Sequence, residues 1–187
     1  MVSIPESAIK IVQTHSVFTD MRMQQYLQNV IFTWQWWLLV FLMIGPWILW
    51  WYLVDKKRLT PICLLGMFVL ATCVWMDDLG TDLILWYYPY KLLPIYPQLV
   101  PINYSVLPVA YMLIYQFFAA WRSYITAMLI MATLFSFVAE PALNYLGIYI
   151  VLKWQYYYSL PIYMLIAISH RWLLEKILAI SRQHMKM

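Results

Sequence analysis

The sequence predicts an all-α integral membrane protein, a helical bundle of about five transmembrane helices. Hydrophobic residues make up 65% of its 187 residues and charged residues only 11%, whereas soluble domains carry about 25% charged residues. Uncharged runs are also long enough, because one bilayer crossing takes about 20 residues. We therefore expect one transmembrane domain over residues 1–187, with an interfacial helix in 1–29 and the bundle in 30–187.

Five stretches are candidates for these crossings. None contains a charged residue, except that Lys153 interrupts the last. They are Val30 to Val54, Leu59 to Met76, Pro101 to Trp121, Ser123 to Ala139 and Tyr145 to Ser169. Residues 83–100 are apolar too, but they contain three prolines, each of which lacks a backbone donor that lipid cannot replace. We expect this Pro- and aromatic-rich segment to be re-entrant or interfacial, or to extend the second helix outward.

Residues 1–29 mix apolar and charged side chains, so we expect an amphipathic helix on the membrane surface. The order of regions differs from that of a signal peptide, and we expect this segment to be retained. Eight of the twelve cations follow the first, third or fifth crossing, and positively charged short loops stay in the cytoplasm. This predicts a cytoplasmic C-terminus, with the N-terminus, the 77–100 connection and a turn near Glu140 outside.

Several function classes lack their usual motifs. The sequence has no histidine and cysteine spacing typical of zinc sites, no glycine-rich phosphate loop and no Gly-x-Ser-x-Gly element. The net charge of +4 agrees with basic cytoplasmic loops beside anionic lipid. Cations are not interleaved with aromatic residues, as they are in nucleic-acid grooves. We expect membrane lipids as partners, no nucleic acid and no metal site.

Carboxylates are the candidate functional groups in so apolar a chain. Asp77, Asp78 and Asp82 follow the second crossing, and Glu140 follows seventeen uncharged residues of the fourth. At about 1.5 Å per residue, Asp77 and Glu140 lie at nearly the same depth. Asp78 and Asp82 share a helical face, from which Asp77 is turned by about 100°. We expect Asp78 and Glu140 to face one another in a sheltered pocket near the outer surface.

Aromatic residues, 19% of the chain, gather near the same level. Most should be interfacial belt residues. The candidate substrate-binding residues are Trp86, Tyr88, Trp154, Tyr157 and Gln116. A purely structural interpretation also stands: the three aspartates are then hydrated, cap a helix or pair with Lys91, and Glu140 has Lys153 as its partner.

Two resemblances add to this interpretation. The first covers most of the chain from Trp34 onward. It is carried by Trp51, Asp55-Lys56-Lys57-Arg58, Asp78, Trp86 to Tyr90, Tyr115-Gln116, Glu140-Pro141, Trp154 and Tyr158-Ser159. This pattern resembles an uncharacterised family of multi-pass membrane proteins from spore-forming Bacillus and Clostridium relatives, which implies the plasma membrane of Gram-positive bacteria.

The second resemblance is confined to a short segment. Its residues are Asp78, Gly80, Trp86, Tyr88 and Pro89. They are similar to a segment of the small integral-membrane lycopene cyclases and related terpene cyclases, whose Pro-x-Glu-Glu element has no copy here. Those enzymes protonate an isoprenoid with embedded carboxylic acids. The resemblance implies a proton-donating role for Asp78.

Acid catalysis on an isoprenoid agrees with the apolar and aromatic composition of the chain. A neutral carboxylic acid can protonate an alkene or epoxide, aromatic faces stabilise the resulting cation, and exclusion of water prevents its quenching. We therefore expect an enzyme that acts on a lipid or isoprenoid without a cofactor, with Asp78 or Glu140 as the donor.

Two alternatives remain open. Asp77, Asp78 and Asp82 are spaced nearly as in the Asp-Asp-x-x-Asp element of prenyl-transferring enzymes, which would place Mg²⁺ at these residues. A non-catalytic permease, channel subunit or scaffold could instead bind a cation or proton through the same acids. Prolines in the crossings, at Pro46, Pro108 and Pro161, are typical of the broken helices of transporters.

Overall fold

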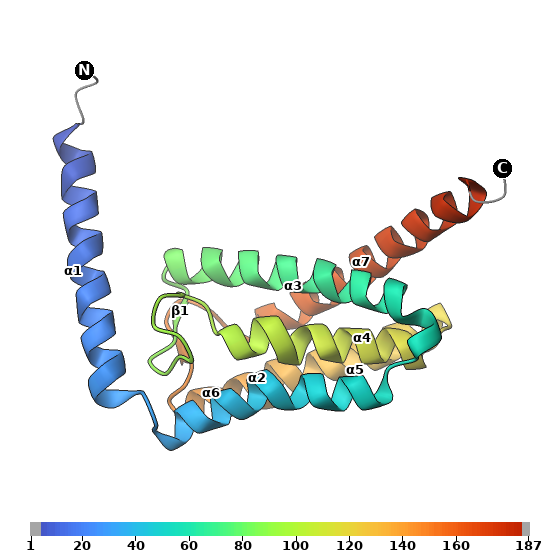
Figure 1. Cartoon of the computed structure of the whole chain (residues 1–187), viewed down its shortest axis with the longest axis horizontal. Coiled ribbons are helices and arrows are strands. Elements are labelled where there is room, and N and C mark those ends of the chain that lie inside the picture. The colour runs from blue at the N-terminus through green and yellow to red at the C-terminus, as the bar shows by residue number, and fades with distance from the viewer. Residues whose placement is uncertain (1–4, 185–187) are drawn as a thin grey trace.

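The computed structural model describes residues 5–184. In this part of the chain, helices are joined by loops and one pair of two-residue strands, so the all-α prediction is confirmed (Figure 1). The elements are α1 (Glu6–Asn29), α2 (Trp34–Leu53), η1 (Lys56–Arg58), α3 (Leu59–Asp82), β1 (Trp86–Tyr87), η2 (Ile102–Val106), α4 (Leu107–Phe117), α5 (Trp121–Leu134), η3 (Phe135–Ala139), α6 (Glu140–Tyr145), β2 (Ile150–Val151) and α7 (Tyr156–His184).

Long apolar helices give the chain the make-up of a membrane protein. Within the described residues, three helical stretches are long and apolar enough to cross a bilayer. They are Trp34–Leu53, Lys56–Asp82 and Trp121–Tyr145. The first begins at a capped residue, because the Thr33 side chain accepts a hydrogen bond from the Trp36 backbone N–H.

Several helices begin or end away from the ends of the predicted crossings. The helix α3 continues six residues beyond Met76 to Asp82. The helical path from Trp121 runs through Glu140 to Tyr145, where the sequence analysis places a turn. The last helix begins at Tyr156 instead of Tyr145. The predicted crossings at α3 and α5 end before a charged residue, Asp77 and Glu140 in turn, but a charge does not end a helix whose backbone hydrogen bonds continue.

The helices α3 and α6 in fact end in the same motif. At the end of α3, the Leu85 N–H donates to the Gly80 carbonyl at 2.9 Å, and Ile84 has a φ of 55°. At the end of α6, the Ile148 N–H donates to the Leu143 carbonyl at 2.9 Å, and Gly147 has a φ of 73°. Both are Schellman motifs, in which glycine usually occupies the left-handed position. Ile84 therefore holds a strained conformation two residues before β1.

Two π-helical segments precede prolines in the same way. In η2 the Leu107 N–H donates to the Ile102 carbonyl, and Pro108 follows. In η3 the Glu140 N–H donates to the Phe135 carbonyl, and Pro141 follows. A proline cannot donate to the preceding turn and its ring crowds the carbonyl there, which the wider π turn relieves.

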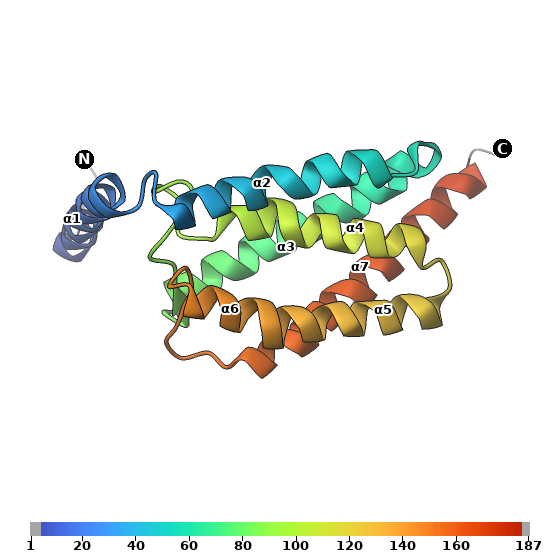
Figure 2. The same cartoon turned by 90° about the horizontal axis from the view of Figure 1, so that it is seen from below.

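The helices α2 to α7 lie side by side (Figures 1 and 2). The helix α3 packs on α4 and α7, and α5 packs on α7. Tyrosine hydroxyls also tie the helices together, because Tyr111 donates to the Tyr163 carbonyl at 2.8 Å and Tyr124 to the Ala167 carbonyl at 3.0 Å. The largest buried side chains of this core are Ile62, Leu65, Val69, Tyr111, Met112, Tyr124, Met128 and Leu174.

Residues 83–100 cover one end of these helices. The strand β1 pairs with β2 in antiparallel fashion, so that Trp86 lies opposite Val151. The helix α1 runs across the direction of the other helices (Figure 1), and no described residue in it is buried. Its last turns attach to the covering segment, because the Tyr26 hydroxyl donates to the Leu92 carbonyl at 2.9 Å.

Candidate functional site

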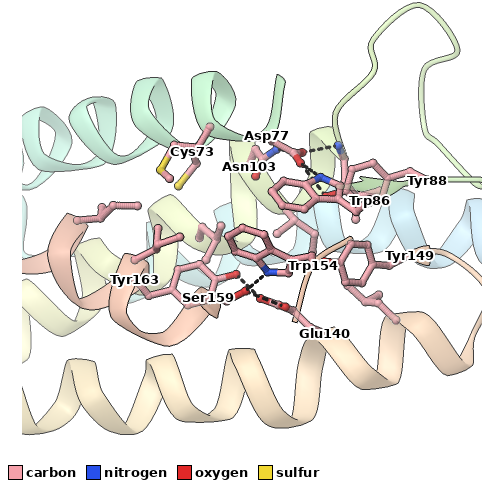
Figure 3. A pocket seen from close by; sticks show the side chains of 17 residues that line it. Cys73, Asp77, Trp86, Tyr88, Asn103, Glu140, Tyr149, Trp154, Ser159 and Tyr163 are labelled. Atoms are coloured by element: carbon pink, nitrogen blue, oxygen red, sulfur yellow. Dashed lines mark hydrogen bonds between the residues drawn. The ribbon is translucent and has the colours of Figure 1, made fainter. Parts of the chain in front are cut away.

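A cavity of about 130 Å³ lies beneath the covering segment, between α3, α6 and α7 (Figure 3). Most of its wall is apolar or aromatic, and a few polar groups converge on it. The lining residues with polar side chains are Asp77, Asn103, Glu140 and Ser159, with Trp86, Tyr88, Tyr149, Trp154 and Tyr163 as the aromatic wall. Concave, mostly apolar sites with few convergent polar groups are typical of ligand pockets.

Asp77 faces this cavity from α3. Its carboxylate accepts four hydrogen bonds from the covering segment and η2. Trp86 Nε1 and the Tyr88 hydroxyl each donate to Oδ1 at 2.7 Å, and the Leu99 N–H at 3.0 Å and the Asn103 amide donate to Oδ2. Four donors face the two oxygens, as befits an ionised carboxylate, which is an acceptor only. Asp77 is therefore a fixed and fully satisfied group.

Asp77 faces the cavity because it lies on the face that α3 buries. The buried residues of this helix include Val69, Cys73, Asp77 and Gly80, spaced by four, four and three residues as one helical face requires. Gly80 allows the indole of Trp86 to lie directly on the helix, because an added Cβ would lie 2.5 Å from ring atom Cε2 and closer still to two others. This contact brings Trp86 Nε1 to the Asp77 carboxylate.

Glu140 faces the same cavity from α6, directly after the π turn of η3. Its Oε2 accepts from the Ser159 hydroxyl at 3.0 Å and its Oε1 from the Tyr163 hydroxyl at 2.9 Å. Ser159 in turn accepts from Trp154 Nε1 at 3.0 Å. Each Glu140 oxygen thus has one protein donor and can accept a further hydrogen bond. Each Asp77 oxygen, in contrast, already has two donors.

The two carboxyl groups belong to separate hydrogen-bonded clusters, with aromatic rings in the view between them (Figure 3). The rings of Trp86 and Trp154 meet edge to face, with centroids 5.0 Å apart. Each indole N–H is bound to one cluster, Trp86 to Asp77 and Trp154 to Ser159. The contact therefore links the two acids through packed aromatic surface.

Both π-helical segments contribute to the cavity. Asn103 lies within η2 and contacts Asp77, and Glu140 follows η3 directly. A π turn inside an α-helix changes the direction of the following side chains and often occurs at functional sites. The proline after η2 also leaves the Tyr104 carbonyl without its usual donor, and Trp47 Nε1 supplies one at 3.1 Å.

Burial affects the phenols of the covering loops. The pKa of Tyr88 is raised well above its ordinary value by burial and by the nearby negative charge of Asp77. Burial likewise raises the pKa of Tyr149, which stacks on Tyr88 with ring centroids 5.6 Å apart. Both phenols therefore remain protonated, and Tyr88 stays a hydrogen-bond donor.

The structure brings Glu140 together with Asp77, not with Asp78 as the sequence analysis expects. Asp78 lies next to Gln98 instead. With its amide nitrogen turned toward Asp78, Gln98 donates to that carboxylate and accepts from the Tyr104 hydroxyl at 3.2 Å. Asp82 is exposed at the end of α3. The error has a simple cause: the helix buries the face that contains Asp77, while Asp78 and Asp82 lie on another face.

This divergence also bears on the magnesium alternative. Asp77 is turned into the cavity and satisfied by four donors, whereas Asp82 is exposed, so the three aspartates do not converge. Within residues 5–184, no group of three or more His, Cys, Asp or Glu side chains could hold a metal ion.

The other expected binding residues fall into two groups. Trp86, Tyr88 and Trp154 line the cavity. Tyr157 is 55% exposed and its hydroxyl lies 3.3 Å from that of Tyr158, so it does not contribute to the wall. Gln116 lies in the last turn of α4, away from the cavity, where it accepts from the Asp55 N–H and donates to the Leu53 carbonyl, each at 2.8 Å.

The expected pairing of Lys153 with Glu140 is wrong. The Lys153 side chain is exposed, and its backbone N–H donates to the Leu85 carbonyl. Ser159 and Tyr163 are the partners of Glu140 instead, and the sequence analysis missed both. They are four residues apart within a predicted crossing, and so lie on one helical face. Asn103 is likewise a polar residue inside a predicted crossing, and this was the signal that could have identified all three.

Comparison with known proteins gives no relative: no protein family, curated protein or solved structure matches the chain.

Proposed function

We infer that the chain crosses the membrane five times, as a bundle formed by α2, α3, the η2–α4 unit, the α5–α6 path and the first half of α7. Support comes from their side-by-side arrangement (Figure 2) and from the many large apolar side chains exposed on them. In this arrangement α1 lies along the membrane surface, as its crosswise direction and its exposed apolar residues suggest. The proposed membrane is the bacterial plasma membrane, with the N-terminus outside and the C-terminus in the cytoplasm.

We propose that the protein is a membrane-embedded enzyme that acts on a lipid or isoprenoid by carboxylic-acid catalysis, with Glu140 as the proton donor. One observation carries this proposal: two acids from helices far apart in sequence line one apolar cavity, and only Glu140 keeps free acceptor capacity. Ionisable groups within a membrane are costly to bury and usually functional.

In the proposed reaction, neutral Glu140 transfers its proton to one carbon of an alkene. The O–H bond breaks, a C–H bond forms from the alkene π pair, and the neighbouring carbon becomes a cation. The negative charge of Asp77 and the ring faces of Trp86 and Trp154 stabilise that cation. An adjacent C–H then returns a proton to the Glu140 carboxylate, which regenerates the acid and leaves an isomerised or cyclised alkene without a co-reactant.

The cavity limits the reacting group. A volume of about 130 Å³ is close to that of an engineered protein cavity of about 150 Å³ that binds benzene. It accommodates a five- or six-carbon unit, such as the end of an isoprenoid chain. The rest of a longer substrate would extend outside this volume, which agrees with a lipid-soluble substrate.

Deuterium uptake provides a test that does not require the product to be known. Protein in liposomes is incubated in D₂O with a neutral-lipid extract of a Gram-positive bacterium, and the lipids are analysed by mass spectrometry. Protonation by the exchangeable acid of Glu140, followed by loss of a different proton, leaves deuterium on carbon. We expect one or more lipids to become heavier with the wild-type protein, and Glu140→Gln to lower the rate by at least about 100-fold.

Two aspartates give matched controls. Asp77→Asn removes the stabilising charge and should also slow deuterium uptake, whereas Asp82→Asn, an exposed carboxylate on the same helix, should leave the rate within twofold. Near-UV circular dichroism checks that each variant keeps its fold. Equal deuterium uptake by the wild type and Glu140→Gln would reject the proposal, as would the absence of uptake with the wild-type protein.

A second candidate function has one observation in its favour. His170 lies midway along α7, where its Nε2 is 2.8 Å from the Thr72 hydroxyl and 3.1 Å from the Phe68 carbonyl. This polar group lies on the α3–α7 contact between the cavity and the buried Arg171, so it could carry a proton through the membrane. Acidification of pyranine-loaded liposomes that is lost in both His170→Leu and Glu140→Gln would favour a proton permease over the enzyme.

A further inference from the structure

A second cavity lies at the opposite end of the helices from the acids. Its volume is about 290 Å³. The helix α7 continues past the neighbouring helices at this end (Figure 1). The wall of this cavity is formed by η1, α4 and one face of α7. Its main lining residues are Arg58, Tyr115, Arg171, Glu175, Leu178 and Arg182.

The lining of this cavity carries more positive than negative charge. Arg171, Glu175 and Arg182 are spaced by four and seven residues, so they lie on one face of α7. Arg58 reaches the same cavity from η1. Three guanidinium groups against one carboxylate leave the wall with two excess positive charges. Within residues 5–184 the one ion pair is Arg171–Glu175, at 2.8 Å, so Arg58 and Arg182 have no carboxylate partner there.

Arg171 is held rigidly in this wall. Only 4% of it is exposed. Its guanidinium donates to the Phe118 carbonyl at 3.2 Å and to the Ala119 carbonyl. The same group lies over the Tyr124 ring, 4.4 Å from the centroid. This side chain is a fixed positive charge at the base of the cavity, with little freedom left to lose on binding a ligand.

Two guanidinium groups converge on one phenol. Arg58 and Arg171 lie 5.5 and 5.8 Å from the centroid of the Tyr115 ring. The Arg58 guanidinium makes only a long 3.4 Å bond to the Gln116 carbonyl. An anion in the cavity would offset these positive charges and use the free donors of Arg58 and Arg182.

We propose that this cavity binds a phosphate group. Guanidinium groups match phosphate oxygens in paired hydrogen bonds, and arginine is preferred over lysine where such recognition matters. The cavity volume of about 290 Å³ is many times the space that one water molecule needs, which is room for a phosphate with part of an attached group. The phosphate can belong to an anionic lipid headgroup or to a soluble phosphate.

The site is independent of the proposed acid catalysis and is tested by binding. Full-length protein in a neutral detergent is titrated with short-chain phosphatidylglycerol and, separately, with inorganic phosphate, and binding is followed by native mass spectrometry and ³¹P NMR. The variants are Arg58→Gln and Arg182→Gln. The control is Lys176→Gln, an exposed cation of α7 that does not line the cavity.

We expect the wild type to bind at least one probe, and each arginine variant to weaken that binding at least tenfold. The Lys176→Gln variant should stay within twofold of the wild type. Competition by inorganic phosphate against the lipid identifies a site for soluble phosphate, and binding of the lipid alone identifies a headgroup site. Binding of neither probe overturns the proposal. Equal weakening by Lys176→Gln also overturns it, since general surface charge would then explain the affinity.

Discussion

Replacement of Gly80 by alanine tests how the Asp77 cluster is assembled. The added Cβ would lie 2.5 Å from Cε2 of Trp86 and closer still to two other ring atoms, whereas carbon atoms pack at about 3.5–4.0 Å. The indole would therefore move by more than about 1 Å. Its hydrogen bond to the Asp77 carboxylate, 2.7 Å long, would be lost.

The expected cost has three parts. Overpacking costs about 1–3 kcal/mol, and the loss of a hydrogen bond to a charged group costs about 1.5–3 kcal/mol. Alanine in place of glycine returns about 1 kcal/mol through its higher helix propensity. The Gly80→Ala variant should therefore lose about 1.5–5 kcal/mol of unfolding free energy.

Unfolding in mixed detergent and SDS, followed by circular dichroism, measures this loss. The control is Gly45→Ala, because a Cβ there would lie 3.3 Å from the nearest atom of the flexible Phe41 side chain, and its stability should not fall. Adding Trp86→Leu to Gly80→Ala should recover the overpacking part. A Gly80→Ala variant as stable as the wild type would refute the proposed close contact.

Three further changes test other parts of the structure. Ile84→Gly should stabilise the protein by about 1 kcal/mol, because a left-handed conformation costs non-glycine residues about 1–2 kcal/mol; Gly147→Ala should destabilise it in the same unfolding assay. The pKa of Lys91 is lowered from 10.5 to about 8, first by burial. The unfolded chain therefore binds more protons between pH 8 and 10.5, and stability should rise across this window by up to about 3 kcal/mol relative to Lys91→Met. Trp47→Phe should lower the unfolding free energy by about 1–3 kcal/mol, because a backbone carbonyl loses its donor, whereas Trp37→Phe, at a 55% exposed position, should change it little.

The long runs without charged residues identified the helical segments from sequence. Lipid requires apolar side chains on a helix whose backbone groups are hydrogen-bonded to one another. The ends of these segments could not be located in the same way. The sequence places a glycine at the left-handed end of α6, where Gly147 is readable as a stop signal. At the end of α3 the same position is Ile84, a residue that gives no such signal, so the end of this helix after Asp82 could not be located.

The two acids of the site were identified unequally. Glu140 was evident as an isolated carboxylate in an apolar stretch. The expectation that Asp78 faces Glu140 was wrong, because Asp77 lines the cavity with Glu140 instead. The buried positions 69, 73 and 77 share one face, which identifies Asp77 once the packed side of α3 is known. The donors Trp86 and Leu99 could not be paired with Asp77 from sequence, because the course of residues 83–100 depends on tertiary contacts.

The π turn before Pro141 was equally hidden. Its presence depends on how the chain accommodates a proline, and the sequence allows either a kink or a wider turn. The structure adopts the wider turn in both η2 and η3. The readable signal here was Glu140, a polar residue directly before an internal proline.

We expect a molecule to reach the two acids of the cavity by way of the short ladder between β1 and β2. Only two residue pairs join these strands, with Tyr87 opposite Ile150 as the second, and the Leu85 carbonyl accepts two further N–H groups. Separating them breaks a handful of hydrogen bonds, each worth about 1 kcal/mol, whereas parting packed helices exposes a whole face of apolar side chains. Thermal fluctuations should therefore separate β1 from β2 far more often than they part the helices. A molecule that enters the cavity should pass between these two strands and the helix ends.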